Sequence, residues 1–280
     1  MMTSSSSKHP RLRALGWRIA NPVLGSPVGS RVSESLLKIL FRGIGVNVGH
    51  ELAQSGESWL VPRILRCCPG ALCADIGANV GGYTDLLLAN GAGSIFAFEP
   101  VPPTFARLAE RTAHLREVTT LNVALGERTG AVEIHVSTDE SASTLASRDS
   151  AMAHRGTDDV IAYEVPMATL DGICFQHDLA FDFVKIDVEG FELEVLRGAA
   201  RTLRERPPAA LQLEFNRHHQ VRRHHIGDYF DALPGYRLFR LAPRSLFPLK
   251  RDHYLSNIYT FQNVVAVRDD RTDLLRALHH

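Results

Sequence analysis

Two apolar runs in this sequence end at residues that could bind a nucleoside. The run 72–76 contains Asp75 and leads into the turn Gly77-Ala78-Asn79-Val80-Gly81, and the run 94–98 ends at Glu99. Glycines in such a turn let backbone N–H groups approach a ligand closely. In a doubly wound sheet, the acid that ends the second strand lies over a bound ribose. The two stretches together predict a nucleoside-binding site.

The spacing of the glycines indicates which nucleoside binds. A dinucleotide site carries G-x-G-x-x-G, whereas this turn reads Gly77-x-x-x-Gly81 and follows Asp75. An acid beside the turn would repel a pyrophosphate, but it could bind the cationic amino-acid part of S-adenosylmethionine. The pattern therefore favours S-adenosylmethionine over NAD. The alternative is an ordinary strand–turn–helix corner with an exposed glutamate.

Acids also follow two later apolar runs. Asp187 comes directly after the run 183–186, and Glu214 lies near the end of the run 209–215. A carboxylate at position 187 would lie beside the methyl donor and could orient or deprotonate a substrate hydroxyl, with Glu214 assisting. Alternatively, Asp187 or its neighbour Glu189 pairs with a basic residue or caps the following helix. We predict Asp187 and Glu214 as catalytic residues.

The same edge could bind a metal ion. Asp187, Glu214 and Asn216 offer two carboxylates and an amide oxygen, which are ligands of the kind that Mg²⁺ binds. A magnesium-like ion there would lower the pKa of a coordinated hydroxyl and hold it toward the donor. The alternative is a metal-free site in which Glu214 hydrogen-bonds the substrate or the backbone. Magnesium is thus an optional second cofactor in this prediction.

Histidines are concentrated just beyond these acids. His218, His219, His224 and His225 share one short segment with several arginines. A neutral histidine is a good base near pH 7, so we include His219 among the catalytic candidates. A solvated polar loop is the alternative. A zinc site is disfavoured because no thiolate shares the segment.

Alternating strand and helix patterns must position these residues. Apolar runs indicate strands, and amphipathic runs such as 191–203 indicate helices. Their repeated order predicts an α/β fold with a mostly parallel sheet, helices on both faces and an antiparallel C-terminal hairpin that includes 257–267. Ligands in such sheets bind outside the carboxyl ends of the strands. The residues at or just past those ends are Asp75, Glu99, Asn122, Asp187 and Glu214.

The chain divides into three predicted parts. Residues 1–29 are typical of a flexible basic tail, 30–69 of a helical extension or cap, and 70–280 of the main domain. Weak contact of the tail with a membrane surface is an alternative to a free tail.

A long polar stretch interrupts the main domain. Residues 132–136 and 160–165 indicate two extra strands, and the segment 137–157 between them is long enough for a lid or substrate loop. The hydroxyl groups of that segment that could contact a substrate belong to Ser141, Ser143 and Thr144.

Composition narrows the class of protein. The chain has 280 residues, 45% of them hydrophobic, which is enough to bury a full core. The formal net charge is zero, so charge gives no general support for nucleic-acid binding. No apolar stretch approaches the ~20 residues that span a bilayer. The four cysteines have apolar neighbours and no C-x-x-C spacing, which favours reduced thiols and a cytoplasmic protein.

The chain resembles the FkbM family of S-adenosylmethionine-dependent O-methyltransferases. The resemblance covers the chain from about residue 70 to about residue 267 and depends on the order of the motifs. These motifs are Asp75-Ile-Gly77-Ala-Asn79-Val-Gly81, Ala97-Phe-Glu99-Pro100, Asn122-Val-Ala124-Leu-Gly126, Leu170-Asp171, Val184-Lys-Ile-Asp187-Val-Glu189-Gly190-Phe-Glu192 and Val195-Leu-Arg-Gly198-Ala199.

The resemblance implies a Rossmann-like class I methyltransferase fold. It also implies that S-adenosylmethionine is the cofactor and that the acceptor is a hydroxyl of a sugar or secondary metabolite. By position, Glu99 would hold the ribose, and Asn122 and Val123 would approach adenine. The residues that would lie at the methionine part of the donor are Asp75, Gly77, Asn79 and Gly81.

Three alternatives have different sequence signatures. A nucleic-acid methyltransferase of the common types carries an Asn/Asp-Pro-Pro-aromatic motif or a Pro-Cys nucleophile, and this chain has neither. An NAD-dependent enzyme carries G-x-G-x-x-G, and a donor-binding module without catalysis would lack the acids at 187 and 214. The sequence therefore favours O-methyl transfer to a small hydroxylated acceptor, with no nucleic acid as partner and no transmembrane segment. It specifies neither the acceptor nor the oligomeric state.

Overall fold

The computed structural model describes residues 24, 26–49, 51–52, 54–137, 146–147 and 160–279. The chain divides into two compact units, Met1–Gly43 and Ile44–His280. Helix α2 (Pro27–Gly43) belongs to the first unit. All the elements named below belong to the second unit. Most of the predicted basic tail, 1–29, lies outside the described residues.

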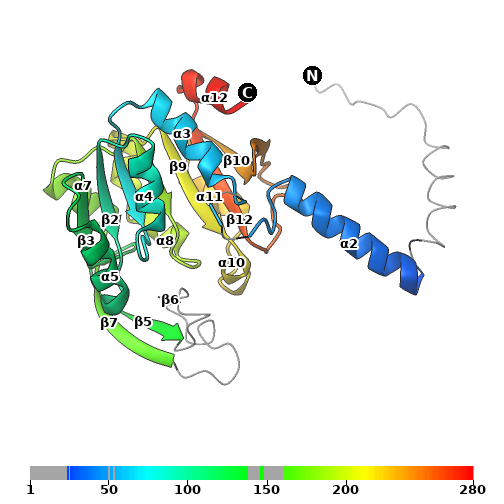
Figure 1. Cartoon of the computed structure of the whole chain (residues 1–280), viewed down its shortest axis with the longest axis horizontal. Coiled ribbons are helices and arrows are strands. Elements are labelled where there is room, and N and C mark those ends of the chain that lie inside the picture. The colour runs from blue at the N-terminus through cyan, green and yellow to red at the C-terminus, as the bar shows by residue number, and fades with distance from the viewer. Residues whose placement is uncertain are drawn as a thin grey trace. The chain divides into compact units, whose positions relative to one another are not determined.

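An eight-stranded sheet forms the centre of the second unit (Figure 1). Its strand order is β11-β10-β12-β9-β8-β1-β2-β3. The strands are β1 (Leu72–Ile76), β2 (Ser94–Phe98), β3 (Val118–Leu121), β8 (Phe183–Ile186), β9 (Ala210–Phe215), β10 (Tyr236–Ala242), β11 (Ser245–Pro248) and β12 (Gln262–Arg268).

The central strands of this sheet are parallel and its C-terminal strands are not. β1 pairs in parallel with β2 and β8, β2 with β3, and β8 with β9. β12 lies between β9 and β10 and is antiparallel to both. The predicted sheet type is therefore confirmed. The sheet grows from β1 toward β3 in one direction and from β8 toward β9 in the other, so its switch point lies between β1 and β8.

A second, smaller sheet has the strand order β4-β7-β5-β6. β5 and β7 pair in antiparallel register from Gly130↔Met167 to Ser137↔Val160, which confirms the two predicted extra strands. The predicted lid residues Ser141, Ser143 and Thr144 lie outside the described part of the chain. The strands of this sheet are β4 (Ala124–Leu125), β5 (Gly130–Ser137), β6 (Ala146–Ser147) and β7 (Val160–Ala168).

Helices pack on both faces of the large sheet, as predicted. One hydrophobic cluster joins α3, α4 and α12 to the sheet, and another joins α7, α8 and α11. The described helices of the second unit are α3 (Glu57–Cys67), α4 (Gly82–Ala89), α5 (Pro102–Thr112), α7 (Leu170–Gln176), α8 (Glu192–Arg197), α9 (Ala200–Glu205), α10 (Arg217–Val221), α11 (Ile226–Ala232) and α12 (Thr272–His279).

The helix predicted over 191–203 is broken into α8 and α9. The break falls at Gly198, where the backbone approaches the segment after β4 so closely that a Cβ would lie 2.0 Å from the carbonyl oxygen of Gly126. A tertiary contact therefore interrupts a helix that local periodicity alone would continue.

Helix α3 belongs to the core of the second unit. Its side chains Leu60, Val61 and Ile64 are fully buried, in one cluster with residues of β1 and β12. Burying side chains of this size contributes about 1.5–3 kcal/mol each. The compact unit therefore begins at Ile44 rather than at residue 70, and the segment predicted as a separate cap is divided between the two units.

Candidate active site

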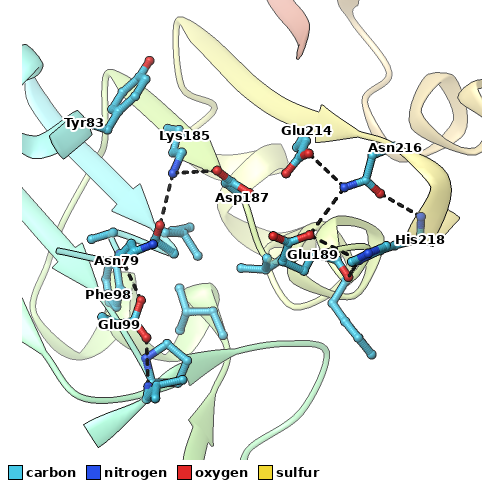
Figure 2. A pocket seen from close by; sticks show the side chains of 18 of the residues that line it. Asn79, Tyr83, Phe98, Glu99, Lys185, Asp187, Glu189, Glu214, Asn216 and His218 are labelled. Atoms are coloured by element: carbon cyan, nitrogen blue, oxygen red, sulfur yellow. Dashed lines mark hydrogen bonds and ion pairs between the residues drawn. The ribbon is translucent and has the colours of Figure 1, made fainter. Parts of the chain in front are cut away.

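One large cavity lies at the carboxyl ends of the central strands (Figure 2). Its volume is about 820 Å³, and its wall includes the ends of β1, β2, β8 and β9 with the loops that follow them. Side chains of the small sheet, such as Ile134, and of the segment before β12, such as Tyr259, complete the wall. This is the switch point of the sheet, where ligands bind in parallel α/β folds.

The loop after β1 forms the part of the wall predicted for the donor. Gly77, Ala78 and Asn79 line the cavity. The backbone N–H groups of Gly77 and Ala78 both donate to the carbonyl oxygen of Phe98 at 2.9 Å. Gly77 has φ +78°, and a Cβ there would lie 1.8 Å from the carbonyl oxygen of Asp187. This position therefore requires glycine because the end of β8 passes against it, and not because of close approach by a ligand.

Glu99 faces the cavity at the end of β2. Its Oε2 accepts a hydrogen bond from the backbone N–H of Asn79 at 3.0 Å, and its Oε1 accepts one from Val101 at 2.9 Å. Burial outweighs these bonds and raises the pKa of Glu99 to about 7. Each carboxylate oxygen has a second lone pair, so the anion can also accept hydrogen bonds from two neighbouring hydroxyls. A ribose diol offers two such hydroxyls, and the ribose contact itself stays a prediction.

Two other residues that were predicted to bind the methyl donor lie behind the cavity wall and support it. The amide nitrogen of Asn122 donates to the carbonyl oxygens of Glu99 and of the next residue, at 2.8 and 2.9 Å. A Cβ on Gly81 would lie 3.0 Å from Leu108 of α5, so Gly81 serves helix packing. Val123, in contrast, lines the cavity. Asn122 therefore holds the Glu99 loop in place, and of the two residues predicted at adenine only Val123 forms part of the wall.

Lys185 is a buried cation in the wall of the cavity. Its Nζ lies 3.2 Å from Asp187 and 3.4 Å from Asp75, and it donates to the carbonyl oxygen of Gly77 at 3.1 Å. Burial alone would lower the pKa of Lys185, but Asp187 and Asp75 raise it above its usual value, so the side chain stays charged. Asp75 is fully buried, and its Oδ2 accepts from Thr84 at 2.7 Å. Asp75 thus lies behind the wall and fixes Lys185, which corrects the prediction that it lines the donor site.

Three carboxyl groups meet across the cavity from Glu99 (Figure 2). Asp187, Glu189 and Glu214 each place an oxygen within 4.8 Å of the other two. Burial, together with Asp187 and Glu189, raises the pKa of Glu214 well above its usual range, and Glu214 shares a hydrogen bond with Asp187. Because β8 and β9 are adjacent and parallel, their ends bring Asp187 and Glu214 together. The raised pKa favours the protonated form of Glu214, which can donate a hydrogen bond to Asp187.

Asn216 connects this cluster to helix α10. Its amide nitrogen donates to Glu214 at 2.8 Å, and its amide oxygen accepts from the backbone N–H of His218 at 2.8 Å. An amide binds a metal through its oxygen, and here that oxygen caps a helix. Glu189 joins Asp187 and Glu214 in the group of carboxyl oxygens that could hold an ion, and the predicted metal site stays a prediction.

The adjacent histidines of α10 lie in different surroundings. His219 is fully buried, and its Nε2 lies 2.8 Å from both Glu192 and the hydroxyl of Tyr229. It does not line the cavity, so the prediction of His219 as a catalytic residue is corrected. His218 does line it, with Nδ1 3.0 Å from the carbonyl oxygen and 3.2 Å from the carboxylate of Glu189. Successive helical residues are about 100° apart, so only one of the two faces the cavity.

Glu57 is a cavity residue that sequence analysis missed. It lies at the start of α3, and burial raises its pKa. Its Oε1 accepts from the amide of Gln212 at 2.6 Å, and Gln212 accepts from the hydroxyl of Tyr83 at 2.7 Å. The available signal was Gln212, a polar residue inside an apolar strand, because a buried polar group needs a partner. The sequence pattern does not say that the partner comes from α3.

Five carboxyl groups line the cavity, and burial raises the pKa of three of them, Glu57, Glu99 and Glu214. The basic residues in its wall are Lys185, Arg217 and His218. An acidic wall attracts a cation and repels a pyrophosphate, while Glu99 accepts hydroxyl donors and apolar side chains such as Val123 suit a base. The carboxyl groups that line it are Glu57, Glu99, Asp187, Glu189 and Glu214.

The parallel strands, the antiparallel β12 between β9 and β10 and the cavity at the switch point describe a Rossmann-like α/β fold. Residues 75–238 match the methyltransferase FkbM domain. The chain belongs to this family, which confirms the resemblance found in its sequence.

Hexuronic acid methyltransferase AglP of Haloferax volcanii is 31% identical to this chain over 134 residues, which are 46% of this chain. The chain spans half of that protein (50%). Among solved structures, methyltransferase FkbM of Methylobacillus flagellatus KT has 18% identity and a TM-score of 0.44, covering 70% of this chain and 43% of that one. An rRNA methylase of Streptococcus thermophilus has 9% identity and a TM-score of 0.40, covering 74% and 93%.

Proposed function

We propose that this chain transfers a methyl group from S-adenosylmethionine to a hydroxyl of a small molecule of the sugar or secondary-metabolite class. The observation that carries the proposal is that one cavity is lined both by Glu99 and by the pair Asp187 and Glu214. Glu99 offers hydrogen-bond acceptors for the ribose hydroxyls, and Asp187 offers a carboxylate that can take a proton. Both are needed for methyl transfer to oxygen, and neither is needed for a purely structural domain.

The residues present fit the donor. Glu99 would hold the ribose hydroxyls, Val123 would contact the base, and the loop Gly77–Asn79 would border the methionine part. The acidic wall suits the positive charges of the sulfonium and the ammonium group. When bound, the donor supplies a methyl group that is already activated for transfer. The protein must therefore position the acceptor oxygen and remove its proton.

Asp187 is the proposed proton acceptor. Its side chain is 39% exposed in the wall of the cavity, and Lys185 lies 3.2 Å away. Glu214 has a raised pKa and shares a hydrogen bond with Asp187, so it donates to the Asp187 carboxylate and orients it. The acceptor hydroxyl gives its proton to Asp187 as its oxygen takes the methyl group.

A sugar is the favoured acceptor. The relative from Haloferax volcanii is named for methylation of a hexuronic acid, which is a sugar that bears a carboxylate. In this chain, Arg217 is an exposed cation that also lines the cavity. A guanidinium can bind a carboxylate through two parallel hydrogen bonds. We therefore include uronic acids among the hydroxylated acceptors to be tested.

Two further predictions belong to this proposal. The acidic cavity disfavours a phosphodiester, so nucleic acid is not expected as acceptor. The four free cysteines, three of them buried, support a cytoplasmic location.

The test is transfer of labelled methyl groups from S-adenosylmethionine to a panel of neutral sugars, uronic acids, phenolic metabolites and RNA. Each acceptor is assayed with magnesium and with a chelator, which decides whether the optional ion takes part. We expect label in hydroxylated small molecules. Labelling of RNA alone would overturn the proposed acceptor class, and donor binding without transfer to any acceptor would favour a non-catalytic module.

A further inference from the structure

An apolar stripe on helix α2 is exposed to water. Val28, Val32, Leu36, Ile39 and Leu40 recur at helical spacing and are 51–74% exposed. Of the ten exposed large hydrophobic side chains among the described residues, seven lie between positions 24 and 40. A contiguous apolar face of this kind marks an interaction surface.

The same helix is basic. Arg31, Lys38 and Arg42 lie along one flank of the apolar stripe, and Glu34, the helix's one acid, pairs with Lys38 at 2.7 Å. Residues 1–43 contain seven Lys or Arg and one Glu, which gives a formal charge of +6. Because the whole chain is neutral, residues 44–280 carry −6. The occupant of the α2 surface must therefore offer both apolar contact and negative charge.

Two occupants from the protein itself meet only part of this requirement. The described residues of 44–280 expose only three large hydrophobic side chains, and these are scattered over β7, α10 and the segment before β12. They are Ile161, Val221 and Tyr254. The second unit thus offers negative charge without a matching apolar patch. A second copy of α2 offers an apolar stripe, but it brings like charges together.

We propose that α2 binds the surface of an anionic membrane, such as the inner face of a cytoplasmic membrane. The apolar stripe would enter the boundary of the acyl chains while Arg31, Lys38 and Arg42 remain near the lipid phosphates. Among the described helices, none has the length and apolar character to cross a bilayer. The helix therefore lies in the plane of the membrane surface. This inference does not depend on the proposed methyl transfer.

The test is cosedimentation of the full chain with vesicles of phosphatidylcholine, with and without about one third phosphatidylserine. Binding is expected to the anionic vesicles and to weaken as salt is added. Ile39→Glu should weaken this binding at least tenfold. Ile161→Glu is the matched control, because the same substitution at an exposed isoleucine outside α2 should leave binding unchanged.

Three results would overturn the inference. The first is absence of binding to anionic vesicles, and the second is equal binding by Ile39→Glu and wild type. The third is a dimer in size-exclusion chromatography that Ile39→Glu converts to a monomer, because α2 would then be covered by a second copy. Equal thermal unfolding temperatures of the two variants would show that folding is not the cause of any difference.

Discussion

The charge of Glu99, the proposed ribose-binding residue, changes near neutral pH. Burial raises its pKa from 4.5 to about 7. Between these two pH values Glu99 is protonated in the folded protein and ionised in the unfolded chain. The folded state is therefore favoured by Glu99 at low pH, and this contribution is lost as pH rises toward 7. Hydroxyl donors favour the anion, so donor binding should strengthen as pH rises through 7.

We predict that Glu99→Gln weakens S-adenosylmethionine binding about 10- to 100-fold, as expected for hydrogen bonds to a charged group worth about 1.5–3 kcal/mol. The variant should also lose the pH dependence near 7. Calorimetric titration between pH 6 and 8 measures both effects. Glu110→Gln, at an exposed position of α5, is the control that should behave as wild type. An unchanged affinity in Glu99→Gln would remove Glu99 from the donor site.

Asp187 carries the chemical step in the proposed function. Asp187→Asn keeps the shape of the side chain but removes the proton acceptor, so turnover should fall about 10²- to 10⁴-fold. Donor affinity should be retained. Steady-state rates and a donor titration of the same preparation separate the two quantities. Asp178→Asn, at a side chain that is 88% exposed, is the matched control. Full turnover by Asp187→Asn would assign the proton to another group.

His219 has a structural role that differs from the one its sequence suggests. Nδ1 of His219 accepts from the backbone N–H of Asn216, and its Nε2 lies 2.8 Å from Oε2 of Glu192. His219→Ala would remove both contacts, and a buried polar group left without its partner costs about 1–3 kcal/mol. We therefore expect a clearly lower unfolding temperature for His219→Ala than for His218→Ala, whose side chain lines the cavity. Differential scanning calorimetry compares the two variants. Equal stability together with loss of turnover in His219→Ala would restore the catalytic role.

At the scale of the elements, the turn after β1 tests how the sheet ends are packed. Gly77→Ala places a methyl group 1.8 Å from the carbonyl oxygen of Asp187, which rigid backbone cannot accommodate. Gly91→Ala is a matched control, since Gly91 has a similar φ of +89° but nothing within 4 Å of a Cβ. Alanine in this left-handed backbone conformation costs about 1–2 kcal/mol, and both variants carry that cost.

Gly77→Ala should therefore unfold at a lower temperature than Gly91→Ala and bind the donor less well. Thermal unfolding and donor titration of the two variants measure these differences. Similar behaviour of the two would show that the end of β8 can move away from the turn.

The predictable elements are those whose pattern is local. The apolar run 94–98 coincides with β2, because a buried strand between turn residues has a clear signature. The break at Gly198 was not predictable, since it depends on contact with Gly126, which is far away in the sequence.

The same distinction applies to the site. Acids at strand ends are visible in the sequence, and the parallel sheet brings Asp187 and Glu214 together. Which acids face the cavity depends on partners from other elements. Thr84 and Lys185 hold Asp75 behind the wall, and no periodicity in the sequence reveals those contacts.

At the scale of the whole molecule, the two units should be separable. The sheet, both of its helical layers and the cavity belong to Ile44–His280. A chain that begins at residue 44 should therefore keep its unfolding temperature and its donor affinity, while it loses binding to anionic vesicles. Calorimetry and cosedimentation of this shortened chain measure the three properties. Loss of donor binding would mean that residues 1–43 contribute to the cavity.

The most direct test of the cavity as a donor site is titration of the full chain with S-adenosylmethionine and, separately, with NAD. We expect one molecule of S-adenosylmethionine to bind per chain, with release of a proton near pH 7 as Glu99 becomes anionic. NAD should not bind, because the acidic wall opposes a pyrophosphate. Binding of NAD, or of neither ligand, would contradict the assignment of this cavity to the methyl donor.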